Sequence, residues 1–600
     1  MDIMKPIASE EIPYGKEWLY EVKYDGFRCV LHWEKDSIQL MSRNKKDLTA
    51  SFPEIVTYCQ AQYPHVSSFL PLKFDGELVV LNNAFQANFS WIQKRGRLKK
   101  TESIMKAAEA RPASFMAFDI LQQAGISYVN KSYENRKSVL TSLFYKFHWD
   151  KQLQLVQASE NPNELWETIF NYMGEGMIAK RKQSLYNSGK SHHDWFKIKN
   201  WRTIQGFLTD FHVKNEYFTF HVYNKEESVE IGKCKHGLPP EDFQTLKNLF
   251  LEKGDYRDGV HKLPPAICAA VNTLDLYKSE LREPEFVSLL PHVSPSECTI
   301  EKLGIDMAMF PENVDLTNTE KVFWPESGLT KGDLLVYIRE MAPYMIPFMN
   351  ERVLTIIRSP DGVEGEYFFQ KHLPDYAPSF INSVLSEDKE KLIICDELNA
   401  LIWFANHGAV EYHLPFQRAG SIHPIEVVFD LDPPDRERFG LAIDAAILIK
   451  RLLDDLELLS FVKTSGNKGL QIHIPLVEGS LTYDDTALFT QAIAYTVEGA
   501  HPDLFTTERM KKKRKERLYI DYVQHGKDKT IIAPYSTRKT REATVAAPLY
   551  WEEVTHALRP EQFTIENVAE RVKTAGCPFT NYFAAGKEQN LKEVLRLIRS

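Results

Sequence analysis

The pattern of expected strands and helices changes twice along the chain, and each change limits what that part can fold into. Residues 1–200 alternate short β-like runs with helical patterns, and from about residue 203 only short strands follow. A second alternation of strands and helices begins after residue 312. Because 600 residues are too many for one hydrophobic core, several domains are expected. The sequence therefore predicts an α+β multidomain protein.

The two changes also predict the domain boundaries. We expect a first α+β domain over residues 1–203 and a small β-barrel over 204–292. Residues 293–312 hold Pro, Ser and acidic residues without clear periodicity, so they are interpreted as a linker. Residues 313–600 are expected to form a second, α/β domain.

Composition excludes several classes of protein. No apolar run reaches the ~18 residues of a membrane span, and no basic segment followed by an apolar one opens the chain. The seven cysteines are scattered singly, which argues against a disulfide framework or zinc site and favours a reducing cytoplasm. The net charge of −9 argues mildly against a nucleic-acid partner. Two local basic runs, 94–100 and 511–517, are either DNA contacts or solvated surface.

The first candidate chemical centre is the segment EVKYDGFR (21–28), which contains Lys-x-Asp-Gly followed by Arg. Alone this pattern is weak, because a strand that ends in an Asp-Gly turn would produce it. Five further segments follow in order: SRN (42–44), FDGELVV (74–80), FMAFDIL (115–121), EGMIAK (175–180) and WFKIK (195–199). The series resembles the nucleotidyltransferase motifs of ATP-dependent DNA ligases and mRNA-capping enzymes.

These residue types suit the transfer of AMP to a lysine. An amine attacks the α-phosphorus of ATP only when it is neutral, so the pKa of the nucleophile is expected to fall. Lys197 and Lys199 lie two apart on an expected strand and share a face, where they could lower that pKa and neutralise the phosphate. Glu77 and Glu175 supply the oxygen atoms that a Mg·ATP site needs.

The resemblance implies a role for each residue, with ATP and Mg²⁺ or Mn²⁺ as cofactors. It makes Lys23 the nucleophile, places Arg28 and Glu77 on the ribose, Arg43 on the phosphate of AMP or DNA, Phe118 on the base and Glu175 on the metal. The expected barrel matches the OB-fold that follows this domain in ligases, and LREPEF (281–286) resembles its end in bacterial ligase D. One departure is that SLLPHV (288–293) follows, in place of the basic Arg-x-Asp-Lys motif that orients pyrophosphate. Adenylylation is then slow, or another basic residue serves.

A second candidate centre lies in the C-terminal half. In VVFDLDPP (427–434), Asp430 and Asp432 are two apart on an apolar strand and project from one face, as two-metal chemistry requires. Capping aspartates before a Pro-Pro turn would produce the same pattern. Further polar segments follow: the Gly-rich turn SGNKG before QIHIP (465–475), then LYIDYVQ (518–524) with Asp521, and APYSTR (533–538).

This second set resembles the archaeo-eukaryotic primase-type polymerase domain of bacterial ligase D. The resemblance implies that Asp430, Asp432 and Asp521 are catalytic and hold two divalent ions. It also implies that an incoming NTP or dNTP is gripped by Ser465, Lys468, His473, Arg538 and His413. The whole chain thus resembles bacterial ligase D, which implies double-stranded DNA ends and a Ku homodimer as partners in non-homologous end joining. Ribo- and deoxynucleotide preference is left open by the residues.

Two alternatives stay open at this point. The first domain could belong to an RNA ligase or a capping enzyme, and the second half could be an end-binding module without activity. A further expectation concerns LTNTEKVFWPESGLTKGDLL (316–335), where Lys321 and Lys331 flank a turn. At this place the ligase D polymerase family carries a lysine pair that binds a DNA 5′-phosphate. We expect the same of these two lysines, with Phe323 or Trp324 stacking on a template base.

Overall fold

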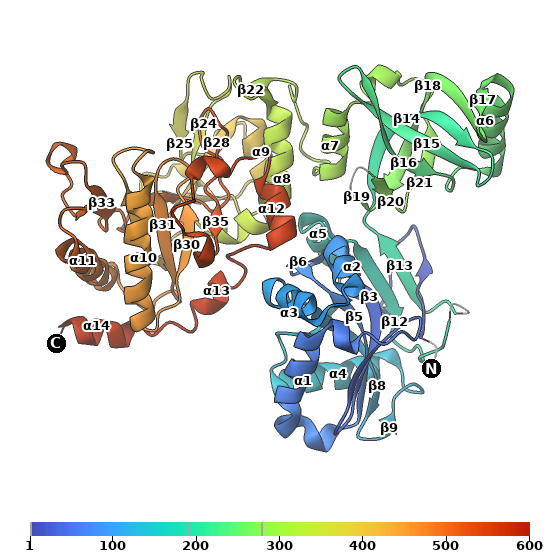
Figure 1. Cartoon of the computed structure of the whole chain (residues 1–600), viewed down its shortest axis with the longest axis horizontal. Coiled ribbons are helices and arrows are strands. Elements are labelled where there is room, and N and C mark those ends of the chain that lie inside the picture. The colour runs from blue at the N-terminus through green and yellow to red at the C-terminus, as the bar shows by residue number, and fades with distance from the viewer. Residues whose placement is uncertain (1–2, 190–191, 278–279, 600) are drawn as a thin grey trace. The chain divides into compact units, whose positions relative to one another are not determined.

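A computed structural model describes residues 3–189, 192–277 and 280–599 of the chain (Figure 1). It has two compact units, one of residues 1–307 with 573–575 and one of residues 308–572 with 576–600. In the part of the chain that the structure describes, no helix is long and apolar enough to cross a membrane.

The first domain of unit 1 is built on two sheets. The five-stranded sheet has the order β1 (Ile7–Ala8), β13 (Trp195–Lys199), β12 (Gly176–Arg181), β2 (Trp18–Val22) and β11 (Ala158–Ser159). The main path of the second runs β10 (Leu153–Leu155), β8 (Ser114–Gln123), β5 (Leu72–Val79), β3 (Phe27–Trp33) and β4 (Ile38–Ser42), with β9 (Ile126–Ser127) beside β8. Five helices accompany them: α1 (Pro53–Val66), α2 (Phe89–Arg97), α3 (Thr101–Ala110), α4 (Tyr133–Phe147) and α5 (Pro162–Asn171).

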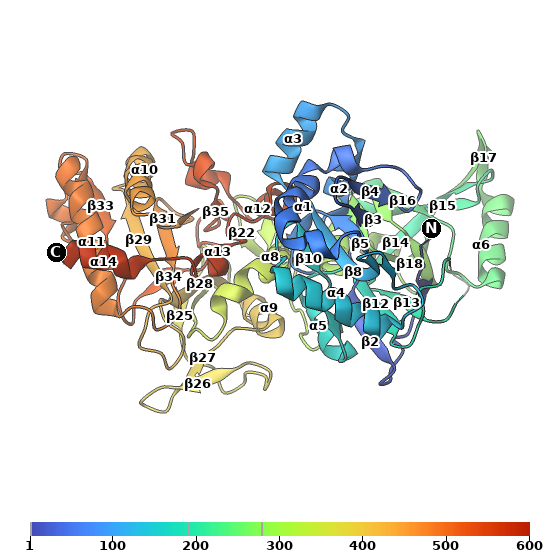
Figure 2. The ribbon, with the colours of Figure 1, turned by 90° about the horizontal axis from the view of Figure 1, so that it is seen from below.

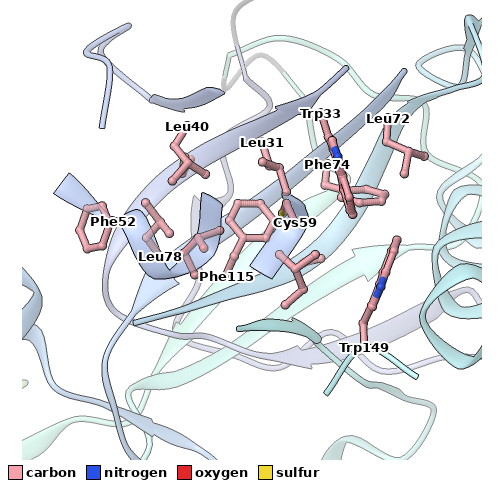
Figure 3. Close-up of a cluster of buried hydrophobic side chains, with 14 of the residues drawn as sticks. Leu31, Trp33, Leu40, Phe52, Cys59, Leu72, Phe74, Leu78, Phe115 and Trp149 are labelled. Carbon is pink, nitrogen blue, oxygen red and sulfur yellow. The ribbon is translucent and has the colours of Figure 1, made fainter. Parts of the chain in front are cut away.

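The core of this domain follows from strand periodicity. On β3, Cys29, Leu31 and Trp33 alternate with more exposed residues and are almost fully buried. They enter one apolar cluster with side chains from β4, β5, α1 and the segment after α4, among them Leu40, Phe74, Cys59 and Trp149 (Figure 3). Burying this face fixes the register of β3 against β5, in which Arg28 pairs with Glu77.

The second domain of unit 1 is the expected β-barrel. Its main strands are antiparallel in the order β16 (Glu227–Cys234), β15 (Tyr217–Asn224), β14 (Arg202–His212), β18 (Val260–Thr273), with β17 (Asp255–Arg257) and β21 (Glu285–Leu289) both on β18. His236, just after β16, bridges to Glu285 of β21 and so closes the ring. Helix α6 (Pro240–Lys253) packs on the barrel core through Leu246 and Phe250. A hairpin of β19 (Asp275–Tyr277) and β20 (Glu280–Arg282) precedes β21.

The expected linker is not irregular. Residues 295–297 form a turn of 3₁₀ helix and α7 spans Ile300–Ala308. Leu303 and Met307 of α7 belong to the barrel's apolar cluster, and Arg202 donates to Met307 O at 3.1 Å. This corrects the linker expectation over 293–312. A helix of only nine residues with Gly304 inside it is too short to be stable alone, and tertiary packing decided its structure.

Unit 2 contains two larger sheets. One has the order β25 (Phe368–Gln370), β24 (Thr355–Arg358), β28 (Ala409–Pro415), β34 (Thr530–Ile532). The other has the order β32 (Phe505–Thr506), β33 (Leu518–Asp521), β29 (Glu426–Asp432), β31 (Leu470–Pro475), β30 (Phe461–Thr464), β35 (Pro548–Leu549). Two hairpins, β22 (Val322–Trp324) with β23 (Leu329–Thr330) and β26 (Ser383–Leu385) with β27 (Lys391–Ile393), accompany them, and the second stands away from the sheets in Figure 2.

The structure describes seven α-helices in this half of the chain, and the last three residues of one of them, α12, belong to unit 1. Helix α8 begins with a capping box in which Thr330 accepts from Asp333 N and Asp333 accepts from Thr330 N. The seven are α8 (Lys331–Met349), α9 (Leu398–Asn406), α10 (Phe439–Asp455), α11 (Tyr483–Ala500), α12 (Val568–Ala575), α13 (Tyr582–Ala585) and α14 (Leu591–Arg599). The predicted α+β class, the barrel and a second α/β part are thus confirmed.

Candidate active sites

Most residues predicted for the first centre line one cavity of about 560 Å³ in unit 1. Sheet pairing brings them there, since Lys23 follows β2, Glu175 precedes β12, and Lys23 N donates to Gly176 O at 2.8 Å. The predicted residues that line the cavity are Lys23, Arg28, Arg43, Glu77, Phe118, Glu175 and Lys197. Six segments spread over residues 21–199 therefore converge on one site, of a size that suits a nucleotide.

The charge state of Lys23 differs from the expectation. Its ammonium donates to Glu175 Oε1, and Asp25 and Glu77 add negative charge nearby. Burial alone would lower the pKa of Lys23, but these carboxylates outweigh it and hold the pKa above its ordinary value. The expected depression is thus absent without nucleotide, because the nearest charges are carboxylates rather than lysines.

The carboxylates themselves fit a cation. Glu175 Oε2 is buried without a hydrogen-bond partner, although Oε1 is paired with Lys23. Burial raises the pKa of Glu77 to about 8, against the opposing effect of Arg28 and Lys23. An unsatisfied buried carboxylate oxygen is what a divalent ion would pair with. The donor set therefore suits the predicted metal at Glu175.

Arg28 and Phe118 lie together, as the roles on ribose and base require. The Arg28 guanidinium stands 4.2 Å from the Phe118 ring centroid and is held by two 2.7 Å hydrogen bonds to Asp75. Lys180 lies 4.4 Å from the Phe118 centroid and pairs with buried Glu21. Sequence reasoning missed Asp75, Lys180 and Glu21, although all three stand inside segments that it singled out.

The two lysines of β13 have different surroundings. Lys197 lines the cavity, whereas Lys199 pairs with Glu283 at 2.8 Å and lies 4.0 Å from the centre of Trp201. Glu283 follows β20 in the barrel domain. The expectation that both lysines act directly on Lys23 is therefore corrected for Lys199, whose charge Glu283 compensates.

The three predicted aspartates of the second centre meet on the second sheet of unit 2. Asp430 and Asp521 are directly paired across β29 and β33, and Asp432 is two residues further on the same face. Burial, together with the charges of Asp432 and Asp521, raises the pKa of Asp430 to about 6, although the Gln471 hydrogen bond opposes it. The three carboxylates therefore repel one another, and a cation bound among them would relieve that repulsion.

As they stand, these side chains are turned toward protein partners. Asp432 pairs with Lys468 at 2.9 Å and Arg514 at 3.3 Å, and Asp521 accepts from Gln524 N at 2.8 Å. Accordingly, among residues 3–189, 192–277 and 280–599 no three His, Cys, Asp or Glu side chains are arranged to hold a metal ion. Lys468 and Arg514 both place positive charge beside Asp432, so the site suits positive charge.

The predicted phosphate-binding residues form two groups. Ser465 Oγ accepts from Gly469 N at 3.0 Å and shapes the turn that carries Lys468, while Gly466 adopts a φ of +72°. His413 and Arg538 converge on one buried carboxylate, Glu411, at 2.9 and 3.4 Å. Sequence reasoning missed Glu411, which stands two residues before His413 on β28 and shares its face.

His473 does not fit its predicted role. Its side chain is 2% exposed, and Nδ1 lies 2.9 Å from Glu426, a carboxylate that Arg352 and Tyr582 also contact. A histidine enclosed in this way is not placed to meet a nucleotide that arrives from solvent. The prediction for His473 is therefore corrected.

The proposed DNA 5′-phosphate residues flank the β22–β23 hairpin. Lys331 N donates to Lys321 O at 2.8 Å, so the backbones adjoin. The side chains have separate partners, since Lys321 Nζ lies 2.6 Å from Asp361 and Lys331 Nζ donates to Asn406 O at 3.0 Å. Phe323 and Trp324 are fully buried, which corrects the expectation that either stacks on a base.

Two adjacent aromatic residues of unit 2, Phe368 and Phe369, are exposed. Val363 N donates to Phe323 O, and the strand β25 that follows carries Phe368 and Phe369, which are 44% and 68% exposed. Single exposed aromatics are common, but adjacent ones beside Arg358, 5.1 Å from the Phe368 centroid, suit stacking on bases. No periodicity marks them in the sequence, because they lie on a short edge strand.

The basic run at 94–100 is split by helix α2. Lys94, Arg97, Lys99 and Lys100 are exposed, but Arg95 is 1% exposed and pairs with Glu54 at 2.8 Å. The expectation that Arg95 contacts a DNA duplex is therefore corrected. A helical period turns one residue of the run toward the core.

Comparison with known proteins finds matches for both halves of the chain. A family model described as "ATP dependent DNA ligase domain" matches residues 5–199, and one described as "LigD, primase-polymerase domain" matches residues 330–579. The "Bifunctional non-homologous end joining protein LigD" of Bacillus subtilis (strain 168) is 38% identical over 605 residues, covering 99% of both chains. The "Multifunctional non-homologous end joining protein LigD" of Pseudomonas aeruginosa is 24% identical, covering 98% of this chain and 72% of that protein.

Solved structures give matches to each part. The polymerase domain of Mycobacterium tuberculosis Ligase D in complex with DNA is 31% identical with a TM-score of 0.43, covering 46% of this chain and 99% of that one. The ligase domain of M. tuberculosis LigD is 21% identical with a TM-score of 0.30, covering 50% and 98%.

The alternative of an RNA ligase or capping enzyme is set aside, because the first domain matches the model of ATP-dependent DNA ligases and the full-length relative is an end-joining protein. The predicted resemblance is confirmed over the whole chain. This chain belongs to the LigD family of non-homologous end joining proteins, and combines an ATP-dependent DNA ligase domain with a primase-polymerase domain.

Proposed function

We propose that the chain repairs double-strand breaks by filling and then sealing DNA ends, with Lys23 as the AMP carrier and Asp430, Asp432 and Asp521 as the metal-binding carboxylates. The observation that carries the proposal is the convergence of seven predicted residues on one cavity around Lys23. The mutual pairing of the aspartates on β29 and β33 supports the second centre.

In the first centre, the chain's own residues would position ATP for attack. Phe118 and Arg28 would enclose the base and ribose, and Glu77 would hydrogen-bond the ribose hydroxyls. A divalent ion held by Glu175 would neutralise phosphate charge and separate Glu175 from Lys23. Freed from that carboxylate, Lys23 loses the interaction that keeps its pKa high.

In the second centre, the three aspartates would hold two divalent ions beside a primer end. Such ions lower the pKa of the 3′-hydroxyl and stabilise leaving pyrophosphate. Lys468 and Arg514, which now pair with Asp432, would turn to the triphosphate of the incoming nucleotide. His413 and Arg538, oriented by Glu411, are placed to do the same.

The partners follow from this activity. Double-stranded DNA ends are the substrate, a Ku homodimer is the protein partner, and the cytoplasm at the nucleoid is the place of action. The test is the joining of linear plasmid with gapped ends, with and without Ku, by wild type, Lys23→Ala and Asp430→Ala. Joining that persists in both variants contradicts the proposal.

The exposed part of the basic run is expected to bind the duplex backbone. Replacing Lys94, Arg97, Lys99 and Lys100 by alanine should weaken binding of nicked DNA alike for all sequences. The slope of log affinity against log salt should fall by about 0.9 for each phosphate that the variant no longer neutralises. Lys35→Ala with Lys151→Ala, two exposed lysines of the same domain, is the control. An unchanged slope in the fourfold variant would assign the run to solvated surface.

Lys321 and Lys331 are expected to recognise a 5′-phosphate across a gap, for which the Lys331 ammonium, on a residue that is 4% exposed, has to leave Asn406 O. Each charge-assisted hydrogen bond to a phosphate contributes on the order of a tenfold preference. Lys321→Ala with Lys331→Met should therefore remove the preference for 5′-phosphorylated gapped DNA in a binding assay, and Phe369→Ala should weaken binding of both DNAs. Lys389→Ala, at an exposed lysine, serves as the control. The site is wrong if the wild type ignores the phosphate.

A further inference from the structure

The barrel domain contributes charge to the wall of the Lys23 cavity. Arg282 ends β20 and Glu283 follows it, and both line the cavity together with Lys23. The Arg282 backbone is fixed on both sides: its N donates to Thr273 Oγ1 at 3.1 Å and its O accepts from Leu274 N at 3.1 Å. Strand pairing within the barrel therefore places Arg282 at the cavity.

The Arg282 side chain stands beside the nucleophile. Its guanidinium pairs with Asp25, two residues after Lys23, and lies 3.9 Å from the Phe89 ring centroid. Both charged side chains are largely buried, 19% exposed for Arg282 and 14% for Asp25. The planar cation is thus oriented by an aromatic ring and a carboxylate, at the edge of the space that a triphosphate must enter.

Two other cations near Lys23, Arg28 and Lys199, have carboxylate partners of their own. Arg28 is held by Asp75 through two guanidinium nitrogens, and Glu283 and Glu285 compensate Lys199. The segment SLLPHV (288–293), which stands where the Arg-x-Asp-Lys motif is expected, contains neither Arg nor Lys. A cation for the outer phosphates has to come from elsewhere in the chain.

We propose that Arg282 is that cation: it exchanges Asp25 for the β- and γ-phosphates of a bound nucleoside triphosphate and stabilises the departing pyrophosphate. The inference rests on the proposed role of Lys23. In the step, the neutral Lys23 amine forms a bond to the α-phosphorus while the bond from that phosphorus to the β-phosphate oxygen breaks. Pyrophosphate leaves with the bonding electron pair, and the one proton that the amine nitrogen loses as the phosphoramide bond forms passes to water.

The exchange is electrostatically reasonable. A triphosphate carries several negative charges and offers adjacent oxygens to the guanidinium fork, whereas Asp25 offers a single charge. Asp25 acts meanwhile as a resting partner that keeps the guanidinium next to the site. Because lysine adenylylation is the one step of ligation in which pyrophosphate takes part, a role on pyrophosphate makes Arg282 specific to that step.

The test uses the full-length protein and compares wild type with Arg282→Ala, Arg282→Lys and the control Arg257→Ala, an exposed arginine of the same barrel. Three quantities are measured: the single-turnover rate of lysyl-AMP formation, the pyrophosphate concentration that half-saturates its reversal, and the sealing of a pre-adenylylated nick. Arg282→Ala should slow the first by roughly 10- to 100-fold and raise the second by a similar factor. It should leave the third within about twofold, and Arg282→Lys should restore part of the loss.

Other outcomes separate the possible failures. If wild type forms no lysyl-AMP, or Lys23→Ala still does, the proposed function fails. If Arg282→Ala adenylylates normally, or slows nick sealing as much as adenylylation, Arg282 only supports the loop of Asp25 and the inference is wrong. Retained nucleotide addition and an unchanged melting temperature of Arg282→Ala show that the variant is folded. If Arg282→Ala does not fold, Arg282→Lys is measured in its place. A wild-type dependence on pyrophosphate in Arg282→Lys then overturns the proposal.

Discussion

Replacing Lys23 with alanine is expected to abolish the covalent attachment of AMP and the sealing of nicked DNA, while nucleotide addition continues at the wild-type rate. The side chain is the only atom group at this position that can carry AMP, so its loss removes the intermediate itself rather than weakening a contact. The loss should reach the detection limit of an assay with radiolabelled ATP. Separate compact units explain why addition is spared.

A matched control sharpens this result. Lys16→Ala removes an exposed lysine earlier in the chain and should label and seal like wild type. A pre-adenylylated nick offers a second check, because sealing it needs no lysyl-AMP and should survive in part in Lys23→Ala. Residual labelling of Lys23→Ala would show that another residue carries the nucleotide.

Asp430→Ala is expected to stop nucleotide addition and to spare the sealing of a simple nick. Asp430 lies between Asp432 on its own strand and Asp521 on the next, so its removal breaks the set of three carboxylates. Losing a ligand of a two-metal site should reduce addition on the order of a thousandfold or more. Primer extension with Mg²⁺ or Mn²⁺ measures the effect, and Asp430→Asn tests whether the charge or the shape is required.

The control here is Asp388→Ala, at an exposed aspartate. It should extend primers like wild type. Full extension activity in Asp430→Ala would show that Asp430 is not needed for catalysis, whereas no extension by wild type would favour the alternative that the second unit binds ends without catalysis. Loss of both activities in either active-site variant would contradict two independent centres.

Much of the first site was predictable because each contributing segment carries its own residue pattern. Lys23, Glu77 and Glu175 stand in short motifs whose order along the chain is informative, and the β-sheets bring them together. The pairing partners were not predictable, because they depend on contacts between distant segments. Asp25 and Arg282, which are far apart in the sequence, meet only in the fold, and so do Glu411 and Arg538.

The errors have a common physical origin. His473, Arg95 and Trp324 were judged by chemical type and local spacing, and each is buried because a helix or strand turns it toward the core. Residue type says what a side chain could do, whereas burial decides whether it meets a ligand. The short helix α7 was missed for the related reason that tertiary packing, not helix propensity, stabilises it.

The backbone on both sides of Ala308 is held by arginine side chains. Arg202 of the barrel donates to Met307 O at 3.1 Å, and Arg339 of α8 donates to Met309 O at 2.9 Å. The two accepting carbonyl groups stand two residues apart in the sequence. A ligase fragment that ends at residue 292 would lose the Leu303 and Met307 packing of its barrel, and one that ends at residue 308 would keep it.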